Sequence, residues 1–302
     1  MLQFPQFFFR ELFHTRDVGF LDALVALEIL ARAGEGPAAR YSNTVDAAAF
    51  LDKNSAAYCG GILEMANARL YDFWGELTTA LKTGQPQNEL KNGKGNPFEI
   101  IYADEQRLEQ FLRAMQGAQL GSFMALVSKV NLSRYATFCD VGGGNAALAT
   151  LVARAFPRLR CKSFDLPPAT TIATRSVAAA GLGERVETVA GDFFKDDLPR
   201  ADVITMGNIL HDWDEAQKKA LIAKAYAAVN PGGLFIAIEN VIDDARRKNI
   251  FGLLVSLNML IELPGGFDYT GAQFDGWCRG AGFARTKVVS LAGPSSAAIA
   301  YR

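Results

Sequence analysis

Three consecutive predicted strands each end in an aspartate, at Asp140, Asp165 and Asp192. Parallel strands direct their carboxyl ends to one edge of a sheet, so these side chains are expected at one crevice. An aspartate in that position accepts hydrogen bonds from the hydroxyls of a ribose. Asp165 could instead cap the helix that follows it. Three carboxylates at one crevice nevertheless favour a nucleoside-like ligand.

The first of these strands runs through DVGGGNA at residues 140–146 into a predicted helix. Backbone amides and a helix amino terminus then face the crevice, and glycines let a ligand approach the main chain. The spacing is Gly-x-Gly-x-Ala, without a second nucleotide-binding half, which argues against a nicotinamide dinucleotide. A single nucleoside with a short zwitterionic tail fits better, with Phe193 against its base and Asp192 accepting from its amino group. S-adenosyl-methionine is the obvious candidate.

A histidine and a glutamate follow the next two predicted strands, His211 in LHDWD and Glu239 in IEN. Neutral imidazole is a suitable base for a phenol near pH 7. A carboxylate that accepts from one ring nitrogen leaves the other nitrogen free to take a proton. The alternatives are a structural histidine and an exposed strand-end acid. Methyl transfer from a sulfonium needs little acid-base help, so such a base adds roughly 10²–10⁴-fold.

The elements that position these residues alternate from Tyr135 onward, as short apolar runs separated by helical patterns. This alternation predicts an α/β fold with a mostly parallel, doubly wound sheet and helices on both faces. Strands are expected at 137–141, 160–166, 186–190, 202–206, 234–239, 286–291 and 296–301. Helices are expected at 146–156, 169–180, 215–229, 249–261 and 271–281.

The first part of the chain is predicted to be mostly helical, with apolar residues at helical spacing over 17–33, 45–81 and 100–132. Residues 83–97 are rich in glycine, proline, asparagine and lysine and predict a loop. We expect two domains, residues 1–100 and residues 101–302.

The composition excludes several classes of protein. The 302 residues hold 31 basic and 32 acidic side chains, a formal net charge of -1, and no basic tract, so nucleic acid is not an expected partner. Two histidines and four scattered cysteines, without a Cys-x-x-Cys pair, argue against a metal site. No apolar run reaches the ~18 residues of a membrane span. We expect a cytoplasmic protein with reduced thiols.

Six motifs in this order closely resemble those of the small-molecule O-methyltransferases, the family of the plant caffeate and flavonoid enzymes, acetylserotonin O-methyltransferase and the bacterial hydroxyneurosporene-type enzymes. The motifs are DVGGG at 140–144, FDLP at 164–167, GDFF at 191–194, LHDWD at 210–214, IEN at 238–240 and PGG at 264–266. The resemblance implies a class I, Rossmann-like methyltransferase sheet of seven strands with the last antiparallel.

The resemblance also implies where S-adenosyl-methionine binds. The residues that would hold it are Gly142, Gly144, Asp165, Asp192 and Phe193. Gly207 lies where the plant members place a lysine that contacts the cofactor.

By the same resemblance, His211 is the general base, with Glu239 and Asp268 as flanking carboxylates. Four residues match positions that line the acceptor pocket, although ordinary apolar core explains each of them equally well. They are Phe111, Met115, Met259 and Leu263.

The sequence departs from the family pattern in three places. Ala146 replaces the usual third glycine of the turn, and Asp268 is one methylene shorter than the usual glutamate. Only residues 1–16 precede the first matched helix, so we expect a shortened domain of the winged-helix type. A homodimer, formed in the family through the missing segment, would depend on residues 45–81.

These observations predict an O-methyltransferase that moves a methyl group from S-adenosyl-methionine to a hydroxyl of a small aromatic or apolar acceptor, leaving S-adenosyl-homocysteine. The alternative is a shortened paralogue that binds S-adenosyl-methionine or a metabolite without catalysis and acts as an interaction or regulatory subunit. Binding of DNA by a winged-helix remnant has little support at this net charge. The sequence names no acceptor and favours oxygen over nitrogen only through His211 and the resemblance.

Overall fold

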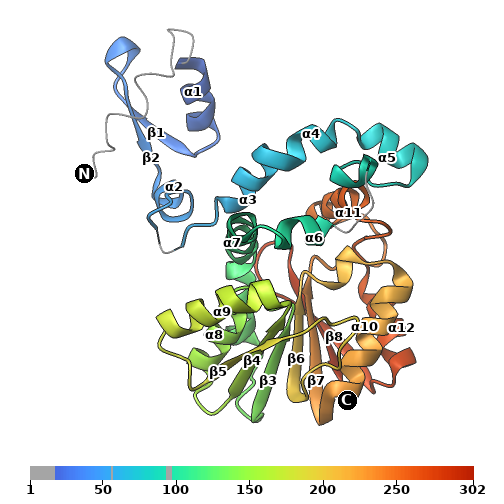
Figure 1. Cartoon of the computed structure of the whole chain (residues 1–302). Helices are drawn as coiled ribbons and strands as arrows, with labels where there is room; N and C mark the ends of the chain where they lie inside the picture. The colour runs from blue at the N-terminus through green and yellow to red at the C-terminus, as the bar shows by residue number, and fades with distance from the viewer. Residues whose placement is uncertain (1–17, 56, 93–96) are drawn as a thin grey trace. The chain divides into compact units, whose positions relative to one another are not determined.

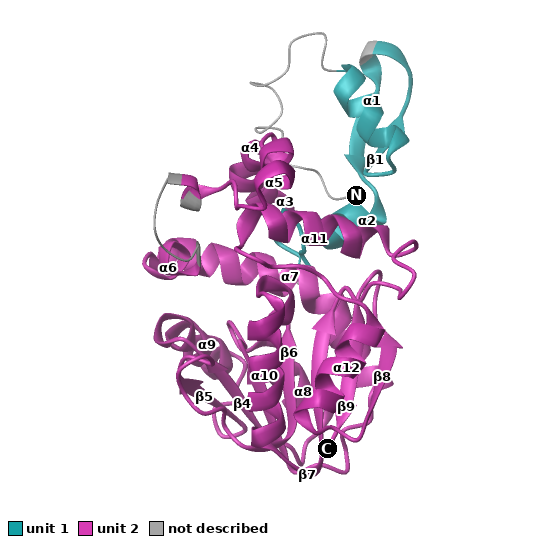
Figure 2. Cartoon of the chain, turned by 90° about the vertical axis from the view of Figure 1, so that its right-hand side faces the viewer, with its two compact units in different colours: residues 1–62 teal, residues 63–302 magenta. Residues whose placement is uncertain are grey.

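The computed structural model describes residues 18–55, 57–92 and 97–302 (Figure 1). The chain divides into two compact units after Ile62, which Figure 2 shows in different colours. The division into domains of residues 1–100 and 101–302 stays a prediction. Residues 1–16, on which the expectation of a shortened domain depends, lie outside the described part.

The unit from Leu63 onward is built on a seven-stranded sheet with the order β5-β4-β3-β6-β7-β9-β8 (Figure 1). Strands β3 to β7 pair in parallel, whereas β9 is antiparallel to both of its neighbours. The predicted α/β fold, with seven strands and the last antiparallel, is therefore confirmed. The strands are β3 (Thr137–Val141), β4 (Arg160–Asp165), β5 (Val186–Ala190), β6 (Ala201–Gly207), β7 (Val229–Glu239), β8 (Arg285–Ser290) and β9 (Ser296–Tyr301).

Helices cover both faces of this sheet, so the strands are apolar on both sides. Successive side chains of β3 alternate between two cores, with Phe138 in one and Cys139 in the other. The first core is completed by helices α7 (Glu105–Lys129), α8 (Ala147–Ala155) and α9 (Pro167–Ala179). The second is completed by α10 (Glu215–Ala228) and α12 (Gly271–Ala281). The strand order reverses between β3 and β6, which places a ligand crevice at their carboxyl ends.

Two capping boxes set where α10 and α12 begin. Asp214 accepts from the amide of Gln217 at 2.8 Å, and the Gln217 side chain accepts from the Asp214 amide. Thr270 and Gln273 make the same pair of bonds at α12. Because each box satisfies amides of a first helical turn, it fixes the segment that enters the helix. Those segments carry the LHDWD motif and Asp268.

The helix predicted over 17–33 is wrong in its second half. Helix α1 (Val18–Ala26) ends with Glu28 at φ 60, where the amides of Glu28 and Ile29 bond back to Val25 and Leu24. This is the hydrogen-bond pattern of a Schellman motif. The sequence does not indicate it, because the left-handed position is usually glycine and here it is Glu28. The chain continues as a hairpin of β1 (Leu30–Ala33) and β2 (Arg40–Asn43), joined through η1 (Gly36–Ala38).

The helices predicted after residue 135 are confirmed within two residues at each end, whereas the two other long helices predicted before it hold in type but not in length. The segment predicted over 45–81 is broken into α2 (Val45–Phe50), α3 (Gly61–Met65), the π-turn η2 (Ala66–Leu70), α4 (Tyr71–Trp74) and the start of α5 (Leu77–Thr83). The segment over 100–132 is split into α6 (Pro97–Tyr102) and α7. The predicted loop contains a short 3-10 turn, η3 (Glu89–Asn92). No helix in the described ranges is long and apolar enough to cross a bilayer.

Candidate active site

The glycine-rich turn after β3 brings bare main chain to the crevice. Gly142 and Gly144 have φ values of 70 and 56, in the left-handed region. A Cβ on Gly142 would lie 2.4 Å from Ile209 Cδ1, so a side chain there would displace Ile209 as well as strain the left-handed turn. Helix α8 begins with no side-chain cap, which leaves its first amides for a ligand. This cradle fits an anionic or zwitterionic group.

Ala146, the departure from the third glycine, lies at φ 64 and is fully buried. The left-handed conformation costs a non-glycine residue about 1–2 kcal/mol, which the surrounding core offsets. The turn therefore keeps its shape despite the alanine.

Asp165 ties the end of β4 to the glycine turn. Its Oδ2 accepts from the Gly144 amide at 2.8 Å, and its Oδ1 accepts from the Leu166 amide at 2.7 Å. Tyr102 of α6 also donates to Oδ1, at 3.3 Å. Burial raises the pKa of Asp165 to about 6, against the hydrogen bonds that lower it. The capping alternative is wrong, because α9 starts at Pro167 without a side-chain cap.

Asp192 and Phe193 follow β5 at the same edge. Burial alone would raise the pKa of Asp192, but the ion pair with Lys195 at 3.0 Å and the Phe194 amide lower it. The Phe193 ring packs edge-on against Phe194 and Trp213, with centroids 4.9 and 5.9 Å away. These rings form an apolar wall beside a carboxylate.

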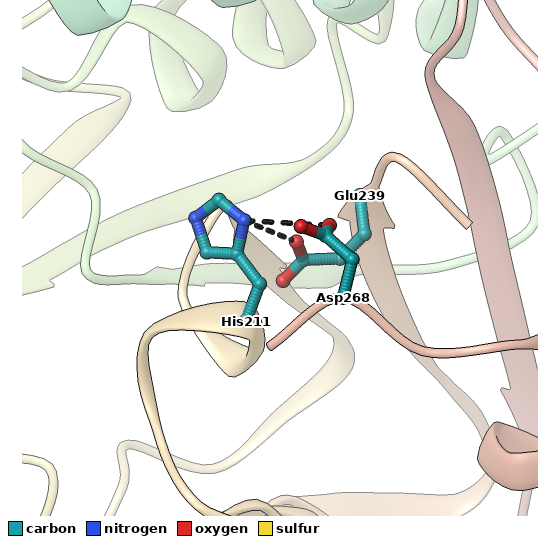
Figure 3. A group of neighbouring side chains, drawn as sticks. All are labelled: His211, Glu239 and Asp268. Carbon is teal, nitrogen blue, oxygen red and sulfur yellow. Dashed lines mark ion pairs between the residues drawn. The ribbon is translucent and has the colours of Figure 1, made fainter. Parts of the chain in front are cut away.

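His211 lies in the turn η4 (Leu210–Asp212) after β6, and the buried carboxylates of Glu239 and Asp268 both face the Nδ1 side of its ring (Figure 3). Its Nδ1 is 3.6 Å from Glu239 Oε2 and 3.5 Å from Asp268 Oδ1. His211, Glu239 and Asp268 are 6%, 1% and 1% exposed, so Glu239 is not the exposed strand-end acid considered as an alternative. The second oxygen of Glu239 accepts from the Leu210 amide at 2.9 Å and fixes the turn itself.

The short side chain of Asp268 reaches His211 because the PGG segment packs directly on η4. Phe267 donates its amide to the His211 carbonyl at 2.8 Å. A Cβ on Gly266 would lie 3.1 Å from that carbonyl oxygen and 3.0 Å from the Asp212 carbonyl oxygen. The glycine therefore permits a main-chain approach that compensates for the missing methylene.

The other ring nitrogen, Nε2, lies 3.3 Å from Asp212 Oδ1. Burial lowers the pKa of His211, but the carboxylates of Glu239 and Asp212 raise it more, to about 10. Burial raises the pKa values of Glu239 and Asp212 to about 7. The ligand-free cluster therefore holds an imidazolium at neutral pH.

A lysine on α10 lies close to this cluster. Lys218 is fully buried, its Nζ donates to the Trp213 carbonyl, and it lies 3.6 Å from the centre of the Phe267 ring. Burial lowers its pKa to about 8, although the charges of Glu239 and Asp212 act in the opposite direction. A buried cation beside several carboxylates reduces the net charge that the core must hold.

His211, Glu239 and Asp268 are also a group, within the described chain, whose donor atoms all lie within 4.8 Å and could hold a metal ion. In the ligand-free protein the imidazolium already supplies the positive charge between the two carboxylates. The ion pairs therefore account for the arrangement.

The structure puts the other predicted residues on three elements. Gly207 ends β6 beneath α7. Phe111 and Met115 are half-buried on α7, and the Phe111 ring lies 6.2 Å from that of Phe98. Met259 and Leu263 are buried at the end of α11 (Ile250–Glu262), one turn apart.

The sequence alone indicates no role for Asp212, Lys218 or Tyr102. Asp212 could have been found, because it belongs to the LHDWD motif. No sequence pattern indicates that Lys218 is buried or that Tyr102 contacts Asp165. Their positions follow from packing between distant segments.

The chain is similar to known proteins over most of its length. The O-methyltransferase domain family matches residues 74–284. The tetracenomycin polyketide synthesis 8-O-methyl transferase TcmO of Streptomyces glaucescens is 38% identical over 93% of this chain and 80% of its own. The 3-hydroxy-5-methyl-1-naphthoate 3-O-methyltransferase of Streptomyces sahachiroi is 33% identical over 85% and 73%. Human N-acetylserotonin methyltransferase in complex with S-adenosyl-methionine superposes with a TM-score of 0.85, at 28% identity over 94% and 82%.

Proposed function

Because the chain belongs to the O-methyltransferase family and uses S-adenosyl-methionine to methylate oxygen, we propose that its acceptor is a small aromatic hydroxyl compound and that His211 removes the hydroxyl proton. The observation that carries this proposal is the buried imidazole held at Nδ1 by Glu239 and Asp268. Two relatives named above methylate the 3-oxygen of a hydroxynaphthoate and an 8-oxygen in tetracenomycin synthesis, which supports an aromatic acceptor.

Three parts of the cofactor would bind at the carboxyl ends of three strands, β3, β4 and β5. The uncapped first turn of α8 and the bare main chain of the glycine turn would hold its charged tail, Asp165 would accept from the ribose, and Asp192 with Phe193 would hold the adenine. Tyr102 adds a hydroxyl at the ribose through its bond to Asp165. When bound, S-adenosyl-methionine supplies an electrophilic methyl group and a neutral thioether leaving group.

The proton moves to Nε2 of His211, because Nδ1 faces the two flanking carboxylates. Glu239 and Asp268 keep Nδ1 protonated and stabilise the imidazolium once Nε2 is charged. Asp212, 3.3 Å from Nε2, adds a third negative charge. Phe111 and Met115 on α7, with Met259 and Leu263 on α11, wall the acceptor.

The non-catalytic alternative loses its support, because both the family assignment and the complete acid-histidine cluster belong to an enzyme. The homodimer and the cytoplasmic location stay predictions. Methylation of oxygen is tested directly by incubating the purified chain with methyl-labelled S-adenosyl-methionine and hydroxynaphthoates. Label should enter the hydroxy compounds but not their methoxy or deoxy analogues, and transfer only to amino analogues would contradict the proposal.

His211→Ala should lower turnover by roughly 10²–10⁴-fold, the usual contribution of a positioned base. Affinity for S-adenosyl-homocysteine, measured by calorimetry, should stay near that of the native chain, because no cofactor-holding residue changes. Lys219→Ala, at an exposed position on α10, is the matched control. Normal turnover of the histidine variant would remove the assigned role.

A further inference from the structure

Gly207 ends β6 and leaves a space that a residue of α7 fills. A Cβ at Gly207 would lie 2.7 Å from Gln119 Oε1 and 3.5 Å from the Phe123 ring. Gln119 therefore lies directly over the bare main chain of Gly207, at the point where the resemblance to plant enzymes puts a lysine side chain. A side chain from another element occupies this position in the crevice.

The amide oxygen of Gln119 is buried and accepts no hydrogen bond from any residue in the described ranges. Leaving a buried carbonyl oxygen unpaired costs free energy, so such atoms in native proteins usually have a missing partner. The oxygen lies at the ligand crevice between β3 and β6. A bound ligand with N–H donors is therefore the natural partner.

The face of helix α7 that carries Gln119 packs along the glycine-rich turn. Leu112 is the side chain nearest to a Cβ built on Gly144, at 3.2 Å. One turn later, Gln116 accepts a hydrogen bond from Asn145. Gln119 is next along this face, since residues four and seven positions after Leu112 share its side of the helix. The face therefore runs from the turn after β3 to the end of β6.

The strand order shows which end of S-adenosyl-methionine reaches this oxygen. Asp165 ends β4 and Asp192 follows β5, and both strands lie on one side of β3. If they hold ribose and adenine, as proposed above, the amino-acid end extends across the turn to β6 on the other side. That end carries an α-ammonium group with three N–H donors.

We propose that Gln119, whose side chain lies over Gly207, binds the α-ammonium group of S-adenosyl-methionine through its Oε1. This inference depends on the cofactor site proposed above and adds how the amino-acid end is recognised. A neutral acceptor from α7 takes the place of a cation from β6. Gly207 is required because any side chain there would displace the glutamine.

The test compares two probes by calorimetry, S-adenosyl-homocysteine and 5′-methylthioadenosine, which keeps the nucleoside and sulfur but lacks the amino acid. Gln119→Leu should weaken S-adenosyl-homocysteine binding about tenfold or more, the usual loss for a hydrogen bond to a charged group. Binding of methylthioadenosine should not change. Gln110→Leu, on an exposed position of α7, is the matched control.

A second variant, Gly207→Ala, keeps the glutamine but displaces its oxygen, and should show the same selective loss. The melting temperature of Gln119→Leu should equal or exceed that of the native chain, because the substitution removes an unpaired buried polar group. Unchanged S-adenosyl-homocysteine binding, or equal weakening of both probes, would overturn the inference. Failure of the native chain to bind either probe would instead overturn the cofactor site itself.

Discussion

His211 is a buried imidazole with carboxylates at both nitrogens, Glu239 and Asp268 at Nδ1 and Asp212 at Nε2. The charges of Glu239 and Asp212 have the largest raising effects on its pKa, which lies at about 10. The ligand-free protein therefore carries a proton on His211 that must leave before the imidazole can act as a base. A cation bound nearby disfavours the imidazolium and lowers its pKa. The sulfonium of the cofactor is such a cation, and the product thioether is not.

Cofactor binding should therefore release protons, and product binding should release fewer. S-adenosyl-methionine and S-adenosyl-homocysteine share their ammonium and carboxylate, so the difference isolates the sulfonium. Calorimetric titrations near pH 8 in two buffers with different ionisation enthalpies measure the protons released. His211→Asn should abolish the difference between the ligands, and equal release by both in the native chain would contradict the explanation.

Lys218 should influence the same equilibrium without touching a substrate. Lys218→Met removes a buried positive charge beside Glu239 and Asp212, so His211 should hold its proton more tightly. The rising limb of turnover against pH should move to higher pH, while Lys218→Arg should restore it in part. Lys219→Met, one residue away and half-exposed, is the control. A uniform loss of activity at every pH would indicate a structural role alone.

At the scale of elements, the PGG segment and the two capping boxes bring the cluster together. Gly265, at φ 80, and Gly266 let the chain after α11 approach the main chain of η4. The end of α11 is itself held, because Asn88 donates to the Glu262 carbonyl at 2.7 Å and Arg69 pairs with Glu262. The end of α11 and the PGG segment that follows it are thus both held by contacts with other elements, and these two segments carry Met259, Leu263 and Asp268.

Gly266→Ala should separate Asp268 from His211, because the new methyl group would press on two carbonyl oxygens of η4. A displacement of this kind near a reacting group lowers turnover by about 10–100-fold. S-adenosyl-homocysteine affinity should be kept. Gly276→Ala, in α12 with open space around its Cβ, should leave turnover unchanged, and equal turnover of the two variants would contradict the argument.

At the scale of the whole molecule, several buried groups bind protons more tightly in the folded chain than in the unfolded one. Burial raises the pKa values of Asp140, Asp212 and Glu239 to about 7, and the carboxylates around His211 raise its pKa to about 10. Where the native state binds more protons than the unfolded state, the free energy of unfolding falls as pH rises. Lys218, with its pKa lowered to about 8, acts in the opposite sense above pH 8.

The contribution of His211 falls between the ordinary histidine pKa and pH 8, where Asp140, Asp212 and Glu239 also release their protons. From about pH 6.5 to pH 8 the native chain keeps the His211 proton that the unfolded chain loses, so the free energy of unfolding should fall by about 1–2 kcal/mol. Urea unfolding at three pH values across this range measures the slope. His211→Asn should make the slope shallower, and a native slope of zero or of rising stability would be incompatible with a buried imidazolium.

Local patterns were enough to predict the strands of the large unit and the residues at their ends. An apolar run bounded by turn residues is a local signal, and a parallel sheet collects every carboxyl end at one edge. The positions of Asp165, His211 and Glu239 at one edge of the sheet follow from that rule. Asp268 came only from the family resemblance, since it follows no strand.

The tertiary structure alone decided which side chains face these residues. Gln119 over Gly207, Tyr102 at Asp165 and the burial of Lys218 join segments far apart in sequence. The Schellman turn at Glu28 shows the same limit locally, because a non-glycine residue gave no warning of φ 60. Such contacts depend on how whole helices settle against the sheet, where packing of many side chains outweighs the preference of any one residue.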